Sequence, residues 1–154
     1  MMLRFVLMLL PWAVPMKDVD KSGFYAVMAS RDIKEVESQL NTLETLSFPE
    51  KDAYVGTLLM KKAGLLTLPK DKLKNFRLGC TKLETAISRD STNAEYRFLR
   101  LSIQEHAPRI VKYSADLPRD KAFIELHFKS LPPVVQDAVR EYSKHSHILH
   151  PESM

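Results

Sequence analysis

The sequence predicts an all-α fold in which about seven antiparallel helices stack as helical hairpins joined by short loops. Apolar residues recur at spacings of three and four, and no segment alternates apolar and polar residues over the length of a strand. Glycine is scarce, at 4 residues, whereas a chain of strands needs many turns that contain glycine. Several of the 9 prolines stand near expected helix starts, where the missing backbone N–H is tolerated.

Capping signals place the first three helices. A short helix is expected over residues 23–30, and Asp32, three residues before Glu35, is typical of the N-cap of a second helix. The apolar residues of that second helix follow helical spacing: Ile33, Val36, Leu40 and Leu43. Ser47 is the expected cap of the third helix. Gly64 is its expected end, because glycine adopts a left-handed conformation without strain.

The central stretch, residues 76–101, is expected to organise the fold. It contains the end of a helix over residues 70–88 and the start of another over residues 93–106, with Thr92 and Glu95 as the expected capping pair. The second of these helices is apolar on more than one side, which places it in the middle of a bundle. The last two helices are each expected to begin at a segment with proline in the first turn, at Asp116-Leu117-Pro118 and at Ser130-Leu131-Pro132-Pro133.

Length and charge pattern bound the classes of function. At 154 residues, with 45% apolar and 27% charged residues, the chain is expected to form one globular domain. The formal charge is +4, but basic and acidic residues are interleaved and no basic run exceeds two residues. A nucleic-acid surface needs clustered positive charge to displace counterions, so we expect no nucleic-acid partner. Cys80 is the single cysteine, which excludes an internal disulfide and favours a small buried side chain.

The first sixteen residues have the layout of a secretory signal peptide. Arg4 precedes an apolar run and a proline break, and the run is shorter than the roughly 20 residues that span a bilayer. Ala13-Val14-Pro15 replaces the usual small-x-small cleavage triplet. A buried N-terminal helix is the alternative, although Pro11 and Pro15 interrupt it. The expected organisation is a signal peptide over residues 1–16, a helical domain over residues 17–144 in the periplasm or outside the cell, and a polar tail over residues 145–154.

The central stretch carries a resemblance to a known family. The residues concerned are Gly79, Leu83, Ala86 and Ile87, then Asp90-Ser91, and then Asn93-Ala94-Glu95-Tyr96. Over residues 76–101 the chain resembles the second helix of a tetratricopeptide repeat running into the first helix of the next repeat. The resemblance implies close helix contact at Gly79, and Ser91 departs from the proline usual in that family. No second copy follows at a period of about 34 residues, so stacked hairpins are expected rather than a regular array.

The whole chain also resembles a group of small exported helical proteins of bacteria. The stretches that carry this resemblance are Phe24 to Ser30, Phe48 to Tyr54, Lys61 to Gly64, and Asn93 to Glu105. The resemblance implies a helical domain behind a leader, and it implies no activity.

Candidate binding residues lie mainly on the helix over residues 93–106. Arg97 and Arg100 are three residues apart and therefore share one face of that helix. The simpler interpretation is a surface stripe that pairs with acids of a neighbouring helix. The alternatives are a polar groove in which the two planar guanidinium groups bind a carboxylate, and a ligand pocket lined by Tyr54, Tyr96 and Arg100.

The histidines form the second candidate site. All five lie at or after residue 106, and His145, His147 and His150 are candidate metal ligands. Residues 147 and 150 share a helix face, whereas residues 145 and 147 share a face only in an extended chain, so the three need a turn to converge. A solvated tail without metal is the simpler interpretation of this stretch.

The catalytic signatures that a sequence can display are missing. There is no H-E-x-x-H, no glycine-rich phosphate loop and no G-x-S-x-G, so we expect neither enzymatic activity nor a cofactor. The expected function is that of a non-enzymatic exported scaffold or a module that interacts with a protein or peptide. The alternative is an exported protein that binds a small ligand or a metal, and no membrane-spanning helix is expected in either case.

Overall fold

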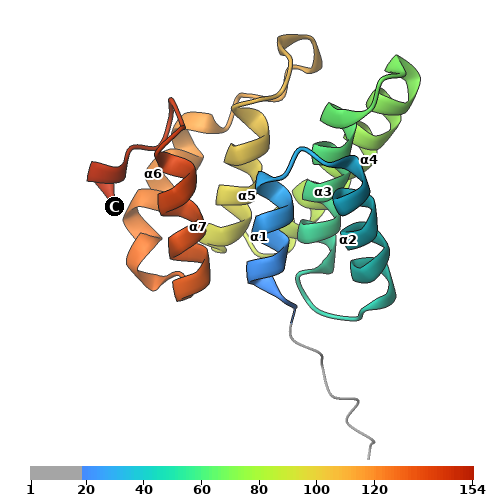
Figure 1. The fold of residues 1–154 in the computed structure, drawn as a ribbon. Coiled ribbons are helices and arrows are strands. Elements are labelled where there is room, and N and C mark those ends of the chain that lie inside the picture. Colours follow the sequence, from blue (N-terminus) through green and yellow to red (C-terminus); the bar gives the residue numbers. More distant parts are fainter. Residues whose placement is uncertain (1–18) are drawn as a thin grey trace, which may run out of the picture.

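The structure is a computed structural model that describes residues 19–154, and within them it contains seven α-helices, three short 3-10 helices and no strand (Figure 1). This confirms the predicted all-α fold. The α-helices are α1 (Lys21–Ala29), α2 (Ile33–Thr45), α3 (Lys51–Leu65), α4 (Pro69–Arg89), α5 (Ala94–Gln104), α6 (Leu117–His127) and α7 (Pro133–Ser143). The 3-10 helices are η1 (Arg109–Val111), η2 (Phe128–Ser130) and η3 (Pro151–Ser153). The expected signal peptide over residues 1–16 lies outside the described residues.

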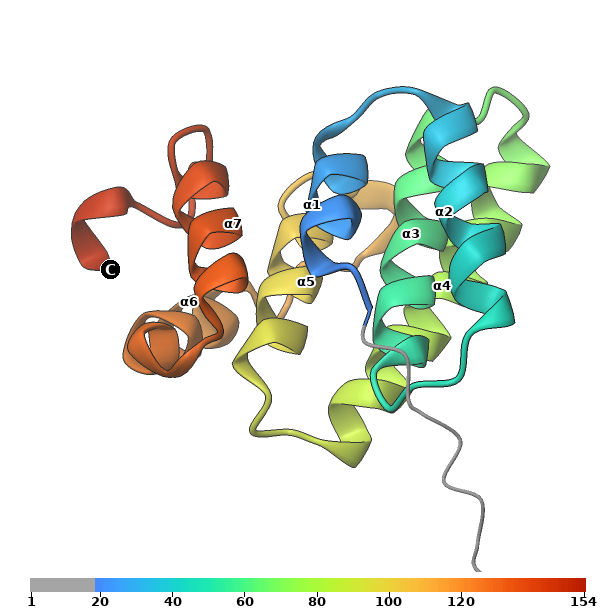
Figure 2. The same cartoon turned by 60° about the horizontal axis from the view of Figure 1, so that its bottom comes forward.

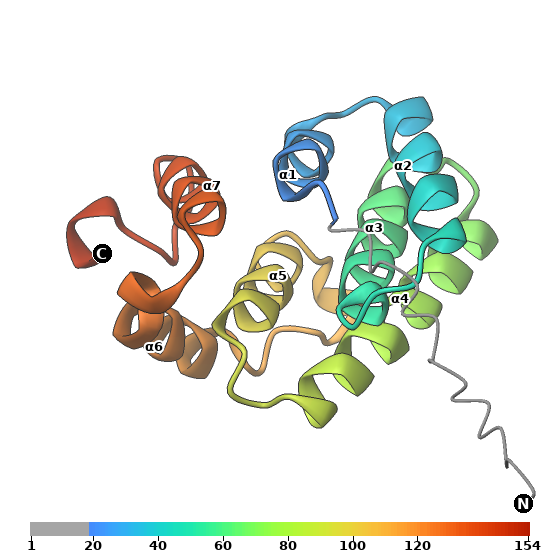
Figure 3. The ribbon, with the colours of Figure 1, turned by 90° about the horizontal axis from the view of Figure 1, so that it is seen from below.

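Helices α1 to α5 run in alternating directions and pack as hairpins, whereas α6 crosses the direction of α5 and α7 (Figures 1 and 2). The most extensive contact joins α3 to α4, with α2 on the other side of α3, and α5 packs against α6. Helix α1 lies in front of α5, and it contacts α2 on one side and α7 on the other, as the view from below shows (Figure 3). The chain therefore closes on itself around α5.

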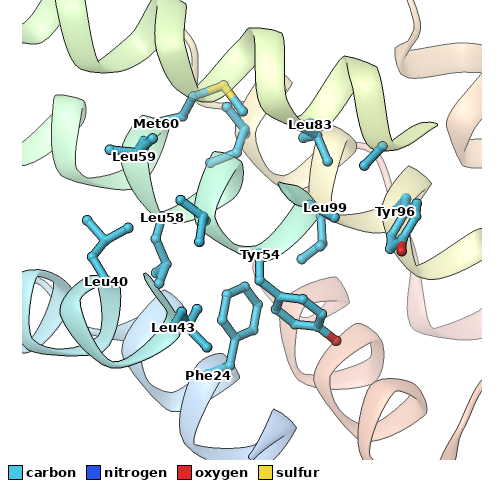
Figure 4. Packing of buried hydrophobic residues seen from close by; sticks show 14 of the residues in the cluster. Phe24, Leu40, Leu43, Tyr54, Leu58, Leu59, Met60, Leu83, Tyr96 and Leu99 are labelled. Atoms are coloured by element: carbon cyan, nitrogen blue, oxygen red, sulfur yellow. The ribbon is translucent and has the colours of Figure 1, made fainter. Parts of the chain in front are cut away.

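Two apolar clusters form the core, and α5 contributes to both. Tyr96, Leu99 and Ile103 belong to a cluster shared with α1 to α4, part of which Figure 4 shows. Phe98 and Leu101, on other faces of the same helix, belong to a cluster shared with α6, α7 and the C-terminal segment. This confirms the prediction that a helix with apolar residues on more than one side occupies the middle of the bundle.

Two glycines allow α3 and α4 to pack closely. A Cβ atom at Gly56 would lie 2.7 Å from the carbonyl oxygen of Gly79, and one at Gly79 would collide with the carbonyl oxygen of Gly56. Any side chain at either position would push the two backbones apart. The close helix contact expected at Gly79 is confirmed.

Several predicted helix ends were wrong, for local reasons. Helix α3 begins after Glu50 without a side-chain cap, so Ser47 is not its N-cap. Gly64 lies within α3, and no glycine of residues 19–154 has a positive φ. Asn93, not Thr92, caps α5: its side chain accepts a 3.2 Å hydrogen bond from the backbone N–H of Tyr96, whereas Thr92 donates its hydroxyl to Asp90.

The C-terminal segment differs from the solvated tail expected over residues 145–154. Leu149 is fully buried in the second cluster, where Ile148 and Met154 also pack. The Ser146 hydroxyl accepts hydrogen bonds from the backbone N–H groups of Ile148 and Leu149, which turns the chain toward the core. The apolar residues within this mostly polar stretch thus fix it to the domain.

Candidate functional site

The described part of the chain contains an apolar groove of about 1500 Å³. It is lined by α1, α5 and α7, by the end of α3, by the start of α4, and by the segment from His106 to Val111. Each wall helix presents one face at helical spacing. On α1 these residues are Ser22, Ala26 and Ala29, on α5 Phe98, Ser102 and Ile103, and on α7 Val134, Ala138 and Tyr142.

Small side chains create the hollow. Ser22, Ala26 and Ala29 occupy positions i, i+4 and i+7 of α1, all three are exposed, and all three line the groove. Larger residues there would fill the space that α1 leaves above α5. Ala138 has the same effect on the facing wall, α7.

Aromatic rings and exposed aliphatic residues make the groove apolar. Phe98 of α5 lies between Tyr25 of α1, at 6.0 Å between ring centroids, and Tyr142 of α7, at 5.5 Å. At the opposite end Leu73 is 42% exposed and Ile110 is 87% exposed. Large aliphatic side chains that face solvent beside an apolar hollow mark a binding surface more often than isolated ones do.

Among the charged side chains that line the groove, the acidic ones form ion pairs and three basic ones do not. Asp137 and Glu141 of α7 pair with Arg140 and Lys144 on the same helix. Arg31, Lys61 and Lys72, on the side of α1 to α4, have no ion-pair partner among residues 19–154. Burial and, secondly, the nearby Arg31 guanidinium lower the pKa of Lys61. Within residues 19–154 the groove therefore carries positive charge that no ion pair neutralises.

Arg97 and Arg100, the predicted binding arginines, do not line this groove. Arg100 is 2% exposed and donates to the fully buried Asp120 from Nε at 2.6 Å and from a terminal nitrogen at 2.7 Å. Arg97 donates to the same carboxylate at 3.1 Å, and Arg100 reaches Glu84 of α4 at 2.9 Å. The expected exposure was wrong for Arg100, because the acids of α4 and α6 satisfy it inside the protein. The simpler interpretation, pairing with a neighbouring helix, describes this arrangement.

Tyr54 and Tyr96 also belong to the interior. Tyr54 is fully buried against Phe24, with ring centroids 4.3 Å apart, and it donates its hydroxyl to Glu95 (Figure 4). Tyr96 is 5% exposed in the same cluster. Neither residue lines the groove, so the structure does not bring Tyr54, Tyr96 and Arg100 together around one open pocket.

Two further carboxylates of α5 and its end hold the groove walls in place. Glu95 accepts hydrogen bonds from Lys21 at 2.6 Å and Tyr25 at 2.9 Å, both on α1. Glu105 accepts from Tyr142 of α7 at 2.5 Å, and also from Ser146 at 2.7 Å. Because Tyr25 and Tyr142 line the groove, these contacts fix both flanking rings relative to α5.

The three candidate metal ligands are spread over the C-terminal segment. His145 lines the groove, His147 donates its backbone N–H to Glu105 at 2.6 Å, and His150 precedes η3. Within residues 19–154 no group of three His, Cys, Asp or Glu side chains could hold a metal ion.

In the same residues no helix is both long and apolar enough to cross a membrane. Burial raises the pKa of the half-buried Cys80 thiol, which makes it a poor nucleophile.

No protein-family model, curated protein or solved structure matches the chain, so the site is interpreted from its own chemistry. Sequence reasoning missed the groove residues of α1 and the cations Arg31, Lys61 and Lys72. One signal was available: Ser22, Ala26 and Ala29 form a stripe of small residues at i, i+4 and i+7. Such a stripe either packs closely on another helix or leaves room for a ligand, and only the fold distinguishes these outcomes.

Proposed function

We propose that this protein is a non-enzymatic interaction module that binds a helical segment of another protein or peptide in the groove. The observation that carries the proposal is the apolar groove between α1 and α7, in which Phe98 lies between Tyr25 and Tyr142. Amphipathic helices bind such grooves through apolar residues at i, i+3, i+4 and i+7. Support also comes from Leu73 and Ile110, whose exposed aliphatic surface extends the groove at its rim.

The size of the groove favours a peptide over a small ligand. Pockets for small molecules typically measure roughly 300–1000 Å³, whereas this groove measures about 1500 Å³. A helix about 10 Å across, rising about 1.5 Å per residue, fills roughly 120 Å³ per residue. The volume of the groove therefore equals that of roughly twelve helical residues.

A binding role also agrees with the position of three hydrogen-bonded carboxylates. Asp120, Glu95 and Glu105 accept hydrogen bonds from neighbouring helices, and none of the three lines the groove. We propose in addition that the module is exported, on the signal-peptide layout of residues 1–16. The mass of the protein recovered from the producing cell tests this part, because export predicts a mature chain that begins near Lys17.

Selection of helical peptides on the full chain tests the proposed function. Peptides from a random library of helix-forming sequences are enriched on the immobilised protein, and their affinities are measured for two tryptophan variants. Ala26→Trp fills the groove from an exposed position of α1, and Thr81→Trp, exposed on α4 outside the groove, is the matched control. We expect binding to weaken roughly tenfold or more in the first variant and to persist in the second. Enrichment of no peptide, or binding unaffected by Ala26→Trp, would contradict the proposal.

A further inference from the structure

The cations of the groove lie on one side of it. Arg31 is in the connection between α1 and α2, Lys61 is near the end of α3, and Lys72 is in the first two turns of α4. These three places are at the same end of the bundle (Figures 1 and 2). The groove is thus apolar along its floor and basic at the end formed by α1 to α4.

Neither wall of the groove supplies an acidic partner for these three cations within residues 19–154. Among the described residues the three cations have no carboxylate within ion-pair distance, although Lys62, beside Lys61, pairs with Glu37 at 2.9 Å. The acids of the facing wall are held by α7 itself, Asp137 by Arg140 at 3.3 Å and Glu141 by Lys144. A ligand that brings carboxylates to the α1–α4 end would therefore meet free positive charge there.

We infer that the partner of the groove is an amphipathic helix whose apolar stripe is flanked by acidic residues on the side that meets Arg31, Lys61 and Lys72. The inference rests on the proposed function and names the chemistry of its partner. The apolar stripe covers Phe98, Tyr25 and Tyr142. Glutamate or aspartate side chains on the flank reach the guanidinium of Arg31 and the two ammonium groups.

Two other occupants are less compatible with these charges. The chain's own residues 1–16 are apolar, but they carry Arg4 and no acidic residue, so they offer nothing to the three cations. A second copy of the chain that docked through the same face would bring like charges together. Both occupants are included as outcomes of the test below.

Two synthetic peptides of equal length test the inference. Both carry the same apolar residues at i, i+3, i+4 and i+7, and one has glutamates and the other lysines on the flank. Fluorescence anisotropy measures their binding to the full chain, to the double variant Arg31→Glu/Lys61→Glu, and to the control Lys34→Glu/Lys129→Glu. The control changes the net charge equally at exposed positions outside the groove.

We expect the glutamate peptide to bind roughly tenfold tighter than the lysine peptide, with the difference shrinking as salt is raised. The groove variant should reverse the preference, and the control should keep it. Equal binding of both peptides, still blocked by Ala26→Trp, would overturn the acidic partner and leave the proposed function standing.

The remaining outcomes also distinguish the two proposals. If neither peptide binds while library peptides do bind the groove, only the inference fails; if library peptides fail as well, the proposed function fails. Tighter binding of a synthetic peptide of residues 1–16 than of the glutamate peptide would make the chain's own segment the occupant. Sedimentation that shows a dimer abolished by Ala26→Trp would make a second copy the occupant, and either result would overturn the inference.

Discussion

Replacing Asp120 with asparagine tests whether the buried ion pairs of α5 hold the second half of the bundle. Asp120 is fully buried at the start of α6, and its carboxylate accepts two hydrogen bonds from Arg100 and one from Arg97. Asparagine keeps the volume and one acceptor oxygen, but it removes the charge. The Arg100 guanidinium would then remain buried with Glu84, which is 38% exposed, and Asp116 at 3.5 Å as its remaining acids.

The expected loss of stability is large for a single isosteric change. Breaking a buried ion pair by removing one partner costs about 3–5 kcal/mol, because the other charge stays in a medium that solvates it poorly. For a chain of this length each kcal/mol lowers Tm by about 2–4 °C, so Asp120→Asn should lower it by roughly 6–20 °C. The matched control is Asp137→Asn, whose side chain is 78% exposed and paired with Arg140. Its effect should stay within about 0.5 kcal/mol.

Urea and thermal unfolding followed by circular dichroism measure both variants. A second variant, Asp120→Leu/Arg100→Met, replaces the pair by apolar side chains and should recover much of the lost stability, since apolar replacement of a buried pair is often neutral. An Asp120→Asn variant as stable as Asp137→Asn would refute the argument that these contacts fix α6 to α5. A double variant less stable than Asp120→Asn would indicate that cavity formation, rather than charge, dominates the site.

Three further outcomes follow from single features of the fold. Gly79→Ala should destabilise the protein by roughly 1–3 kcal/mol, because the added methyl group overpacks against Gly56. Gly64→Ala should stabilise it by about 0.5–1 kcal/mol in the same unfolding assay, because no neighbouring atom lies near the added methyl group. All five tyrosines have raised pKa values, with burial the first cause and that of Tyr96 raised to about 12. A tyrosine whose pKa is higher in the folded than in the unfolded protein, where it is near 10, contributes to folding stability; this contribution is complete below about pH 10 and is lost as the pH rises. Tyrosinate absorbance and loss of helix should therefore appear together as the pH is raised. Zinc should leave Tm unchanged in the presence or absence of a chelator, and a rise of several degrees would show that His145, His147 and His150 converge on a metal.

The helices themselves were predictable because they depend on local sequence. The apolar period of three and four identified α2 and α4, and the apolar faces of residues 93–106 placed α5 in the centre of the bundle. Helix ends were less predictable, since several residues compete for each cap. Thr92 and Asn93 are both capping residues, and the choice between them was made by the geometry of one turn.

The buried ion pairs and the groove were not predictable, because they join residues far apart in the chain. Glu95 binds Lys21, 74 positions away, and Asp120 binds Arg100 across two helices. A charged residue on a helix is assigned to solvent by default, so Arg100 was expected at the surface. Arg100 is buried because acidic residues of α4 and α6 pair with it. The sequence of residues 93–106 alone contains no information about these distant partners.

The carboxylates of Glu95 and Glu105 connect the central helix α5 to the walls of the proposed binding surface. An apolar contact in place of Glu95 or Glu105 would have little directional preference, so it would constrain the position of α1 or α7 along α5 less. A tyrosine hydroxyl bound to a carboxylate constrains that position more, because a hydrogen bond weakens steeply as its alignment worsens. Tyr25 and Tyr142 are bound in this way on the two sides of Phe98, with their rings in the groove. These two hydrogen bonds favour the arrangement in which both rings line the groove, so a partner helix that binds there would need less ordering of the walls, which lowers the entropic cost of association.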